Sequence, residues 1–150
     1  MDKGLRADLT AAGADFDVTL EKRLMGNEDL YEKCLFMFAD SRSTLDNFES
    51  FLEKKEYEKA FDEIHAIKGT AANVGLIRLQ DQAEMNNAKT FEERLALLEG
   101  NMNRGMIPSL EIVNEALRFN MQDDARFEKW CGDFRSECET VIELIESYRK

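Results

Sequence analysis

Apolar residues recur at steps of three and four along most of this chain, a spacing that places them on one face of an α-helix. The clearest example is the segment 57–74, where the recurring positions are Tyr57, Ala60, Phe61, Ile64, Ile67, Ala71 and Val74. The chain has one proline and eight glycines, and no segment alternates like a strand. The sequence therefore predicts an all-α fold, an antiparallel up-down four-helix bundle with additional short helices at the N-terminus and in the C-terminal half.

Turn and capping residues divide the N-terminal half into three predicted helices, at about 15–25, 28–54 and 57–74. Asn27 is expected to cap the second helix, because its side chain can accept from a free backbone N–H in the first turn. The cluster at 40–43 is expected to kink or briefly interrupt that helix. Gly75 is expected to end the third helix, where a left-handed residue is often needed.

In the C-terminal half, a helix is predicted from Leu76, another at 107–119 and a last one from near Asp123 to 148. Residues 91–98 either extend the helix from Leu76 or form a short helix of their own. The inward stripe of the helix from Leu76 begins with apolar residues, but Asn86, Asn87 and Thr90 follow. Amides inside a bundle must be hydrogen-bonded or face an opening. This turn is therefore expected to lie beside His65.

His65 is the only histidine, and it projects about 120° from the centre of the apolar face of its helix. We expect its side chain to meet solvent, on a flank shared with Glu58, Asp62, Lys68, Gly69 and Ala72. Glycine inside a helix costs roughly 1 kcal/mol relative to alanine, so Gly69 makes sense if another body approaches closely there. An exposed imidazole, a neighbouring ammonium and bare backbone suggest a histidine that carries a phosphoryl group. The alternative is a surface histidine without a function.

The segment His65-Ala-Ile-Lys-Gly-Thr-Ala-Ala-Asn-Val-Gly-Leu76 resembles the signature of histidine-containing phosphotransfer (HPt) domains of two-component phosphorelays. The similarity extends upstream through residues 14–17, 24–31 and 37–40, and covers roughly residues 8–90. It implies that His65 is phosphorylated, with Lys68 beside it and Gly69 and Ala72 leaving access. The family position twenty-two residues after the histidine commonly holds a Glu or Gln that hydrogen-bonds the imidazole. Here it is Asn87, and the preceding position, usually apolar, is Asn86.

Charge and composition exclude several other functions. With 31 acidic and 20 basic side chains the net charge is −11, and no basic cluster interrupts it, so nucleic-acid binding is not expected. The chain shows no signal peptide and no apolar run near the roughly 20 residues that span a bilayer, which predicts a cytoplasmic protein. The three cysteines lack paired spacing, and one histidine cannot assemble a conventional metal site.

The resemblance and the chemistry together predict a phosphocarrier without catalytic activity of its own. Neutral imidazole can attack phosphorus near pH 7. We expect His65 to exchange a phosphoryl group with receiver-domain aspartates, with Mg²⁺ on the receiver and no cofactor on this chain. The expected partners are response-regulator receivers and a sensor or hybrid histidine kinase. The chain is expected to be one domain, 1–150, and a monomer. A phosphorylation-independent scaffold of the same fold is the alternative, and an enzyme such as a histidine phosphatase is least favoured.

Overall fold

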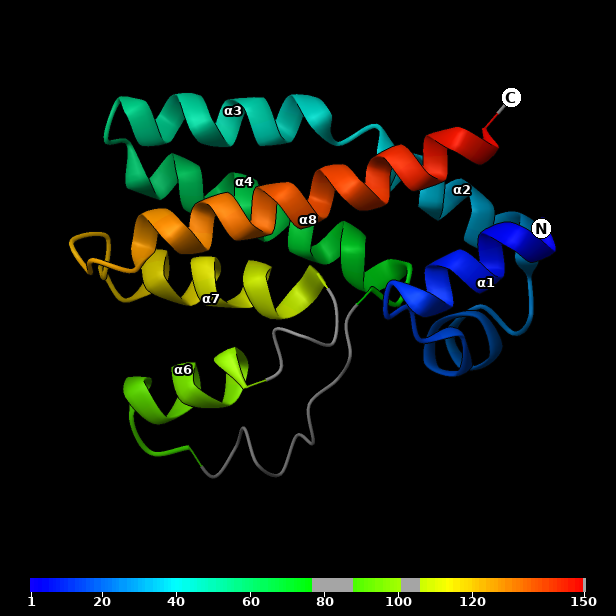
Figure 1. Ribbon diagram of the computed structural model, residues 1–150, viewed down its shortest axis with the longest axis horizontal. Coiled ribbons are helices and arrows are strands. Elements are labelled where there is room, and N and C mark those ends of the chain that lie inside the picture. The colour runs from blue at the N-terminus through cyan, green and yellow to red at the C-terminus, as the bar shows by residue number, and fades with distance from the viewer. Residues whose placement is uncertain (77–87, 101–105, 150) are drawn as a thin grey trace.

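The computed structural model describes residues 1–76, 88–100 and 106–149. Within these ranges the regular structure is helical and contains no strand, so the predicted all-α class is confirmed. In chain order (Figure 1) the elements are α1 (Lys3–Ala11), the π-helix η1 (Asp17–Arg23), α2 (Glu28–Ala39), α3 (Arg42–Glu53), α4 (Tyr57–Asn73), α6 (Phe91–Glu99), α7 (Met106–Arg118) and α8 (Phe127–Tyr148).

Four of these helices, α3, α4, α7 and α8, lie side by side along the long axis of the molecule (Figure 1). α4 packs against α3 on one side and α7 on the other, while α8 packs against α7. α2 precedes α3 and packs against α8 and α4. The short helices α1 and η1 lie at the end of the bundle where both termini are found (Figure 1). The predicted bundle with additional short helices is therefore present.

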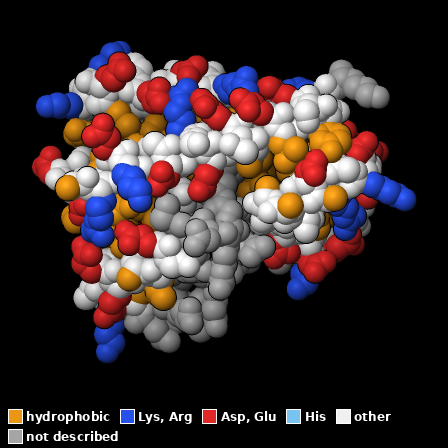
Figure 2. Space-filling view, in the orientation of Figure 1, with side chains coloured by type: hydrophobic (Ala, Val, Ile, Leu, Met, Phe, Trp, Pro, Cys, Tyr) orange, Lys and Arg blue, Asp and Glu red, His pale blue; other side chains and the backbone are white. Residues whose placement is uncertain are grey.

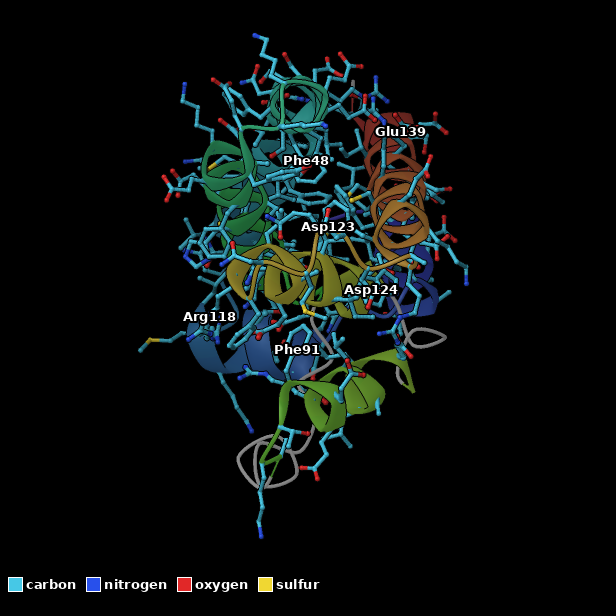
Figure 3. All side chains as sticks on the ribbon, turned by 90° about the vertical axis from the view of Figure 1, so that its left-hand side faces the viewer. Phe48, Phe91, Arg118, Asp123, Asp124 and Glu139 are labelled. Carbon is cyan, nitrogen blue, oxygen red and sulfur yellow. The ribbon has the colours of Figure 1, made fainter. Side chains whose placement is uncertain are left out.

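Apolar side chains from every bundle helix meet in one core. Phe48 of α3 points inward (Figure 3) and meets the ring of Phe134 on α8 edge to face, with centroids 5.0 Å apart. Tyr31 of α2 is fully buried, and its hydroxyl donates to the carbonyl oxygen of Val74 at 2.7 Å. Each such buried side chain contributes on the order of 1.5–3 kcal/mol to folding. The Tyr31 hydrogen bond also ties α2 to the end of the helix that carries His65.

The N-terminal region differs from the prediction in two ways. The prediction of short N-terminal helices gave bounds only for 15–25 and none for α1; Asp2 caps α1, accepting from the backbone N–H of Gly4 at 2.7 Å, and Leu5 and Leu9 are buried on one face. A cap followed by leucines four residues apart is a readable helix signal that we did not use. The helix predicted at 15–25 is present over the shorter span 17–23, and it is wound as a π-helix.

The single long helix predicted at 28–54 is two helices, α2 and α3, separated at Asp40 and Ser41. The predicted cap is confirmed, because Asn27 accepts from the N–H of Leu30 at 3.1 Å. At the break the hydroxyl of Ser41 donates to the carbonyl oxygen of Met37 at 3.2 Å. The interruption allowed for at 40–43 is therefore real.

In the C-terminal half, residues 91–98 belong to a separate short helix, α6, which Thr90 caps by accepting from the N–H of Glu93 at 3.1 Å. This helix packs on α7, and Phe91 contacts Phe119 with ring centroids 4.8 Å apart (Figure 3). The prediction of a helix at 107–119 is confirmed by α7. No helix in the described ranges is long and apolar enough to cross a membrane.

The start predicted for the last helix, near Asp123, is wrong, because α8 begins at Phe127. The residues before it form turns instead, and one of them is held by the guanidinium of Arg126. Arg126 makes two hydrogen bonds of 3.0 Å to the carboxylate of Asp124. This pairing lowers the pKa of Asp124 to about 2. Because the chain is held in this turn, the first helical turn of α8 cannot begin at Asp123.

Candidate functional site

His65 lies in the middle of α4 with its side chain exposed, whereas its neighbour Ile64 is fully buried. Residues with a left-handed backbone conformation flank this helix at both ends. Lys55 has φ 59° in the turn before α4, and Gly75 has φ 70° just after it. The predicted helix, its predicted end at Gly75 and the predicted exposure of His65 are all confirmed.

The imidazole ring stacks on the side chain of Phe61, one helical turn earlier. The two ring centroids are 5.7 Å apart and the ring planes are inclined by only 13°. Our sequence reasoning placed Phe61 on the apolar face and missed this contact. The signal was available, because residues four apart on a helix are neighbours on its surface.

Lys68 is not the free surface cation that we expected on the flank of His65. Its ammonium Nζ lies 2.9 Å from Oε1 of Glu111 on α7, and the two side chains are only 25% and 17% exposed. The pair therefore lies at the interface between α4 and α7, where it is partly shielded from water. Glu111 could not be found from local spacing, because the contact depends on which helix packs beside α4.

Gly69 is exposed, and a Cβ built on it would meet no atom of the described residues within 4 Å. Among those residues, no neighbouring helix packs against Gly69. Ala72, on the same flank, is half-buried. The surface one to two turns after His65 thus carries small side chains, as expected if another molecule approaches there. The docking role of these two residues stays a prediction.

Asn86 and Asn87 lie outside the described residues, so the predicted hydrogen bond from Asn87 to His65 stays a prediction. In the described part of the chain, α7 packs beside α4 and runs in the opposite direction (Figure 1). Lys68 lies opposite Glu111, so the register places Asn114 near the level of His65. The side chain of Asn114 is 4% exposed, and its Oδ1 has no hydrogen-bond partner among the described residues.

A groove of about 450 Å³ begins one turn before His65. Its lining comes from α4 and from the end of α7, namely Tyr57, Glu58, Phe61, Asp62, Leu117, Arg118 and Asn120. Phe61 belongs both to this groove and to the stack with His65. Arg118 lies at its edge, at the end of α7 (Figure 3). The groove therefore combines aromatic and apolar side chains with charges of both signs, one turn before His65.

Other reactive groups do not assemble a competing site in the described ranges. No group of three or more His, Cys, Asp or Glu residues there is placed to hold a metal ion. The free thiols of Cys131 and Cys138 lie on α8, and burial raises the pKa of Cys131 to about 12 and that of Cys138 further. Such thiols are poor nucleophiles at neutral pH. On the face shown in Figure 2, acidic and basic side chains are interspersed, with no broad basic surface.

This arrangement has the parts that phosphoryl transfer to a side chain requires. An imidazole has ring nitrogens that can act as nucleophiles, and that of His65 is exposed in the middle of α4. A cation one turn away can offset charge on phosphoryl oxygens. The open backbone at Gly69 gives a second macromolecule room to reach the ring.

Part of the chain matches a known protein family. Residues 36–104 match the family model of the Hpt domain. The matched segment begins within α2, includes α3, α4 and α6, and contains His65. It starts later than the resemblance we placed at 8–90 and extends further along the chain. No curated protein and no solved structure matches this chain.

Proposed function

Because this chain carries an Hpt domain, we propose that it relays a phosphoryl group on His65 between aspartates of response-regulator receiver domains. Hpt domains as a family are phosphocarriers that work with two-component kinases and receivers. One observation supports the specific proposal most. The only histidine of the chain is exposed in the middle of α4, inside the matched segment, beside the open surface at Gly69.

The proposed reaction is a reversible exchange between an aspartyl phosphate and the imidazole. A ring nitrogen lone pair of His65 attacks the phosphorus in line with the bond to the aspartate oxygen. The N–P bond forms as that P–O bond breaks, and the aspartate leaves as a carboxylate. The reverse reaction, onto a second receiver, returns His65 to neutral imidazole. We expect Mg²⁺ to be bound by the receiver and to balance charge on the transferring group.

The chain itself contributes position and charge in this proposal. The stack on Phe61 limits the orientations of the imidazole, and α4 holds the imidazole at the surface of the bundle. Lys68 brings a positive charge to the same flank. We expect no use of ATP by this chain alone, so a kinase or a phosphorylated receiver must supply the phosphoryl group. Exchange in both directions then makes the protein a relay.

The second candidate function is a scaffold that binds its partners without phosphorylation. The groove that begins one turn before His65 is the observation that favours it, because aromatic and apolar side chains mixed with charged ones suit protein binding. The two candidates differ in one measurable respect. A relay must carry phosphate covalently on His65, whereas a scaffold needs only the surface around it.

The decisive experiment incubates the chain with a panel of receiver domains charged with labelled phosphate. We expect acid-labile label on the parent chain and none on His65→Gln, which keeps the fold. Circular dichroism melts of both proteins control for folding. Label that persists on His65→Gln would assign the phosphate to another residue. Binding of a receiver without any label on the parent chain would favour the scaffold.

A further inference from the structure

We infer that Glu111 tunes how firmly the phosphoryl group is held at His65, because it competes with that group for the ammonium of Lys68. The inference rests on the proposed phosphorelay function and adds a regulating residue to it. Glu111 is a positioning residue here: it acts through Lys68 and is not itself required to touch the phosphoryl group. It lies on α7, outside the segment that matches the family model.

The ion pair between Lys68 and Glu111 is the first observation. Its N···O distance of 2.9 Å is within hydrogen-bond range, and both side chains are less than one-third exposed at 25% and 17%. Ion pairs that are partly shielded from water are screened less than pairs on the open surface. In the unphosphorylated protein, therefore, the ammonium of Lys68 already has a strong partner.

The position of the pair relative to His65 is the second observation. Lys68 follows His65 by three residues, which places the two on neighbouring positions of the same helix surface. A phosphoryl group on His65 would bring a charge of about −1.5 to −2 and three acceptor oxygens to this surface. The ammonium has three N–H donors, and Glu111 engages one of them. The carboxylate and the phosphoryl group would thus share one cation and repel each other.

The competition has a defined direction. While Glu111 is ionised, part of the attraction that Lys68 offers to the phosphoryl group is cancelled by the nearby negative charge. Removal of that charge leaves the whole ammonium for the phosphohistidine. The phosphorylated state of His65 should then become more stable relative to an aspartyl phosphate. A relay intermediate has to pass its phosphoryl group on. Weaker attraction between Lys68 and the phosphoryl group makes that transfer easier.

The test measures the equilibrium ratio of phospho-His65 to phospho-aspartate after exchange with one receiver that phosphorylates the parent chain. We expect Glu111→Gln to shift this ratio about 3- to 10-fold toward phospho-His65, comparable to the loss of one close charge interaction. Glu111→Asp keeps the charge on a shorter side chain and should shift the ratio less, in the same direction. Glu139→Gln is the matched control, because it removes an acid that pairs with Arg135 on α8. It should leave the ratio unchanged.

A double-variant cycle separates competition from a general effect on structure. If Glu111 acts mainly through Lys68, then Glu111→Gln should shift the ratio much less in a Lys68→Ala background, where only its direct repulsion of the phosphoryl group remains. An unchanged ratio in Glu111→Gln, a shift toward phospho-aspartate, or an equal shift in the Lys68→Ala background would each overturn the inference while leaving the relay intact. Absence of label on parental His65 with every receiver would overturn the relay and this inference together.

Discussion

The imidazole ring of His65 lies almost parallel to the phenyl ring of Phe61, with 5.7 Å between the ring centroids. One face of the imidazole is therefore covered by its own helix, while its edge, which carries the ring nitrogens, stays available. Phe61 also forms part of the groove that begins beside it. The same side chain thus contacts the imidazole of His65 and lines the surface next to it.

Phe61→Ala should slow phosphoryl transfer in both directions without unfolding the bundle. Aromatic stacking contributes about 0.5–1.5 kcal/mol, so the loss of orientation should slow transfer by roughly 2- to 10-fold. Rapid-quench measurement with one phosphorylated receiver gives the two rates. Phe61→Tyr keeps an aromatic ring and should transfer at close to the parental rate. Equal rates for Phe61→Ala and the parent would show that the stack does not help the reaction.

Gly69 should affect docking and stability in opposite directions. Since a Cβ at this position meets nothing within 4 Å, Gly69→Ala should stabilise α4 by about 0.5–1 kcal/mol and raise the melting temperature slightly. Gly69→Gln should also leave the bundle folded, but its longer side chain would stand between His65 and an incoming receiver. We expect it to slow transfer sharply.

Gly132 provides a matched control for that experiment. It is an exposed glycine inside α8, and a Cβ on it also meets nothing within 4 Å. Gly132→Ala and Gly132→Gln should change the melting temperature as the Gly69 variants do, with no effect on transfer. Parental transfer by Gly69→Gln would contradict the docking role, and so would an equal slowing by Gly132→Gln.

Lowering the pH from 8 to 5.5 should stabilise the protein through Glu137 of α8. Burial raises the pKa of this carboxyl from about 4.5 to about 7; nearby Asp133 also raises it, while the hydroxyl of Ser109 on α7 opposes the change. Between these two values the folded state holds a proton that the unfolded chain has released, so stability falls as pH rises through 7. Denaturant unfolding at the two pH values measures the difference.

Glu137→Gln should remove that part of the pH dependence and should be more stable than the parent at pH 8. Glu143→Gln, at an exposed position of the same helix, should leave the pH dependence as it is. A parental pH dependence in Glu137→Gln would show that the carboxyl titrates at the same pH in the folded and unfolded chains.

Gly75→Ala should destabilise the protein by about 2–4 kcal/mol, because strain and crowding add at this position. Gly75 has φ 70°, and a Cβ there would lie 2.6 Å from Oγ1 of Thr19 and 2.7 Å from the carbonyl oxygen of Asp15. Gly26 has φ 77°, but its Cβ would meet only Glu21 Oε2, at 3.7 Å. Gly26→Ala therefore introduces backbone strain without crowding, and it should lower the free energy of unfolding by about 1 kcal/mol. A denaturant titration measures this change. Equal costs for the two variants would contradict the crowding.

The helices themselves could be predicted because their apolar stripes are local features of the sequence. Residues 57–74 and the last helix are clear cases. The stripe could not reveal the break at Ser41, because the apolar spacing of α2 continues into α3 across it. The signal for it was the polar cluster at 40–43, because Asp and Ser side chains favour local bonds over continued helix.

The candidate site was predictable only in part, for a related reason. The position of His65 and the openness at Gly69 follow from the geometry of a single helix. The partner of Lys68 depends on tertiary packing, because it required knowing that α7 lies beside α4 and at which register. The expected position of Asn86 and Asn87 beside His65 lies outside the described residues and stays a prediction.

The two ends of the chain close against distant parts of the molecule. The hydroxyl of Tyr148 donates to Oδ2 of Asp8, 140 residues earlier, at 2.6 Å, and Arg149 bonds Asp40, 109 residues earlier, at 2.6 Å. On a ribosome, α4 emerges well before α7 and α8, the helices that cover it and α2. A nascent chain thus leaves apolar surface of α4 and α2 uncovered until α7 and α8 have been made, so the bundle around His65 closes only after α8 has been synthesised.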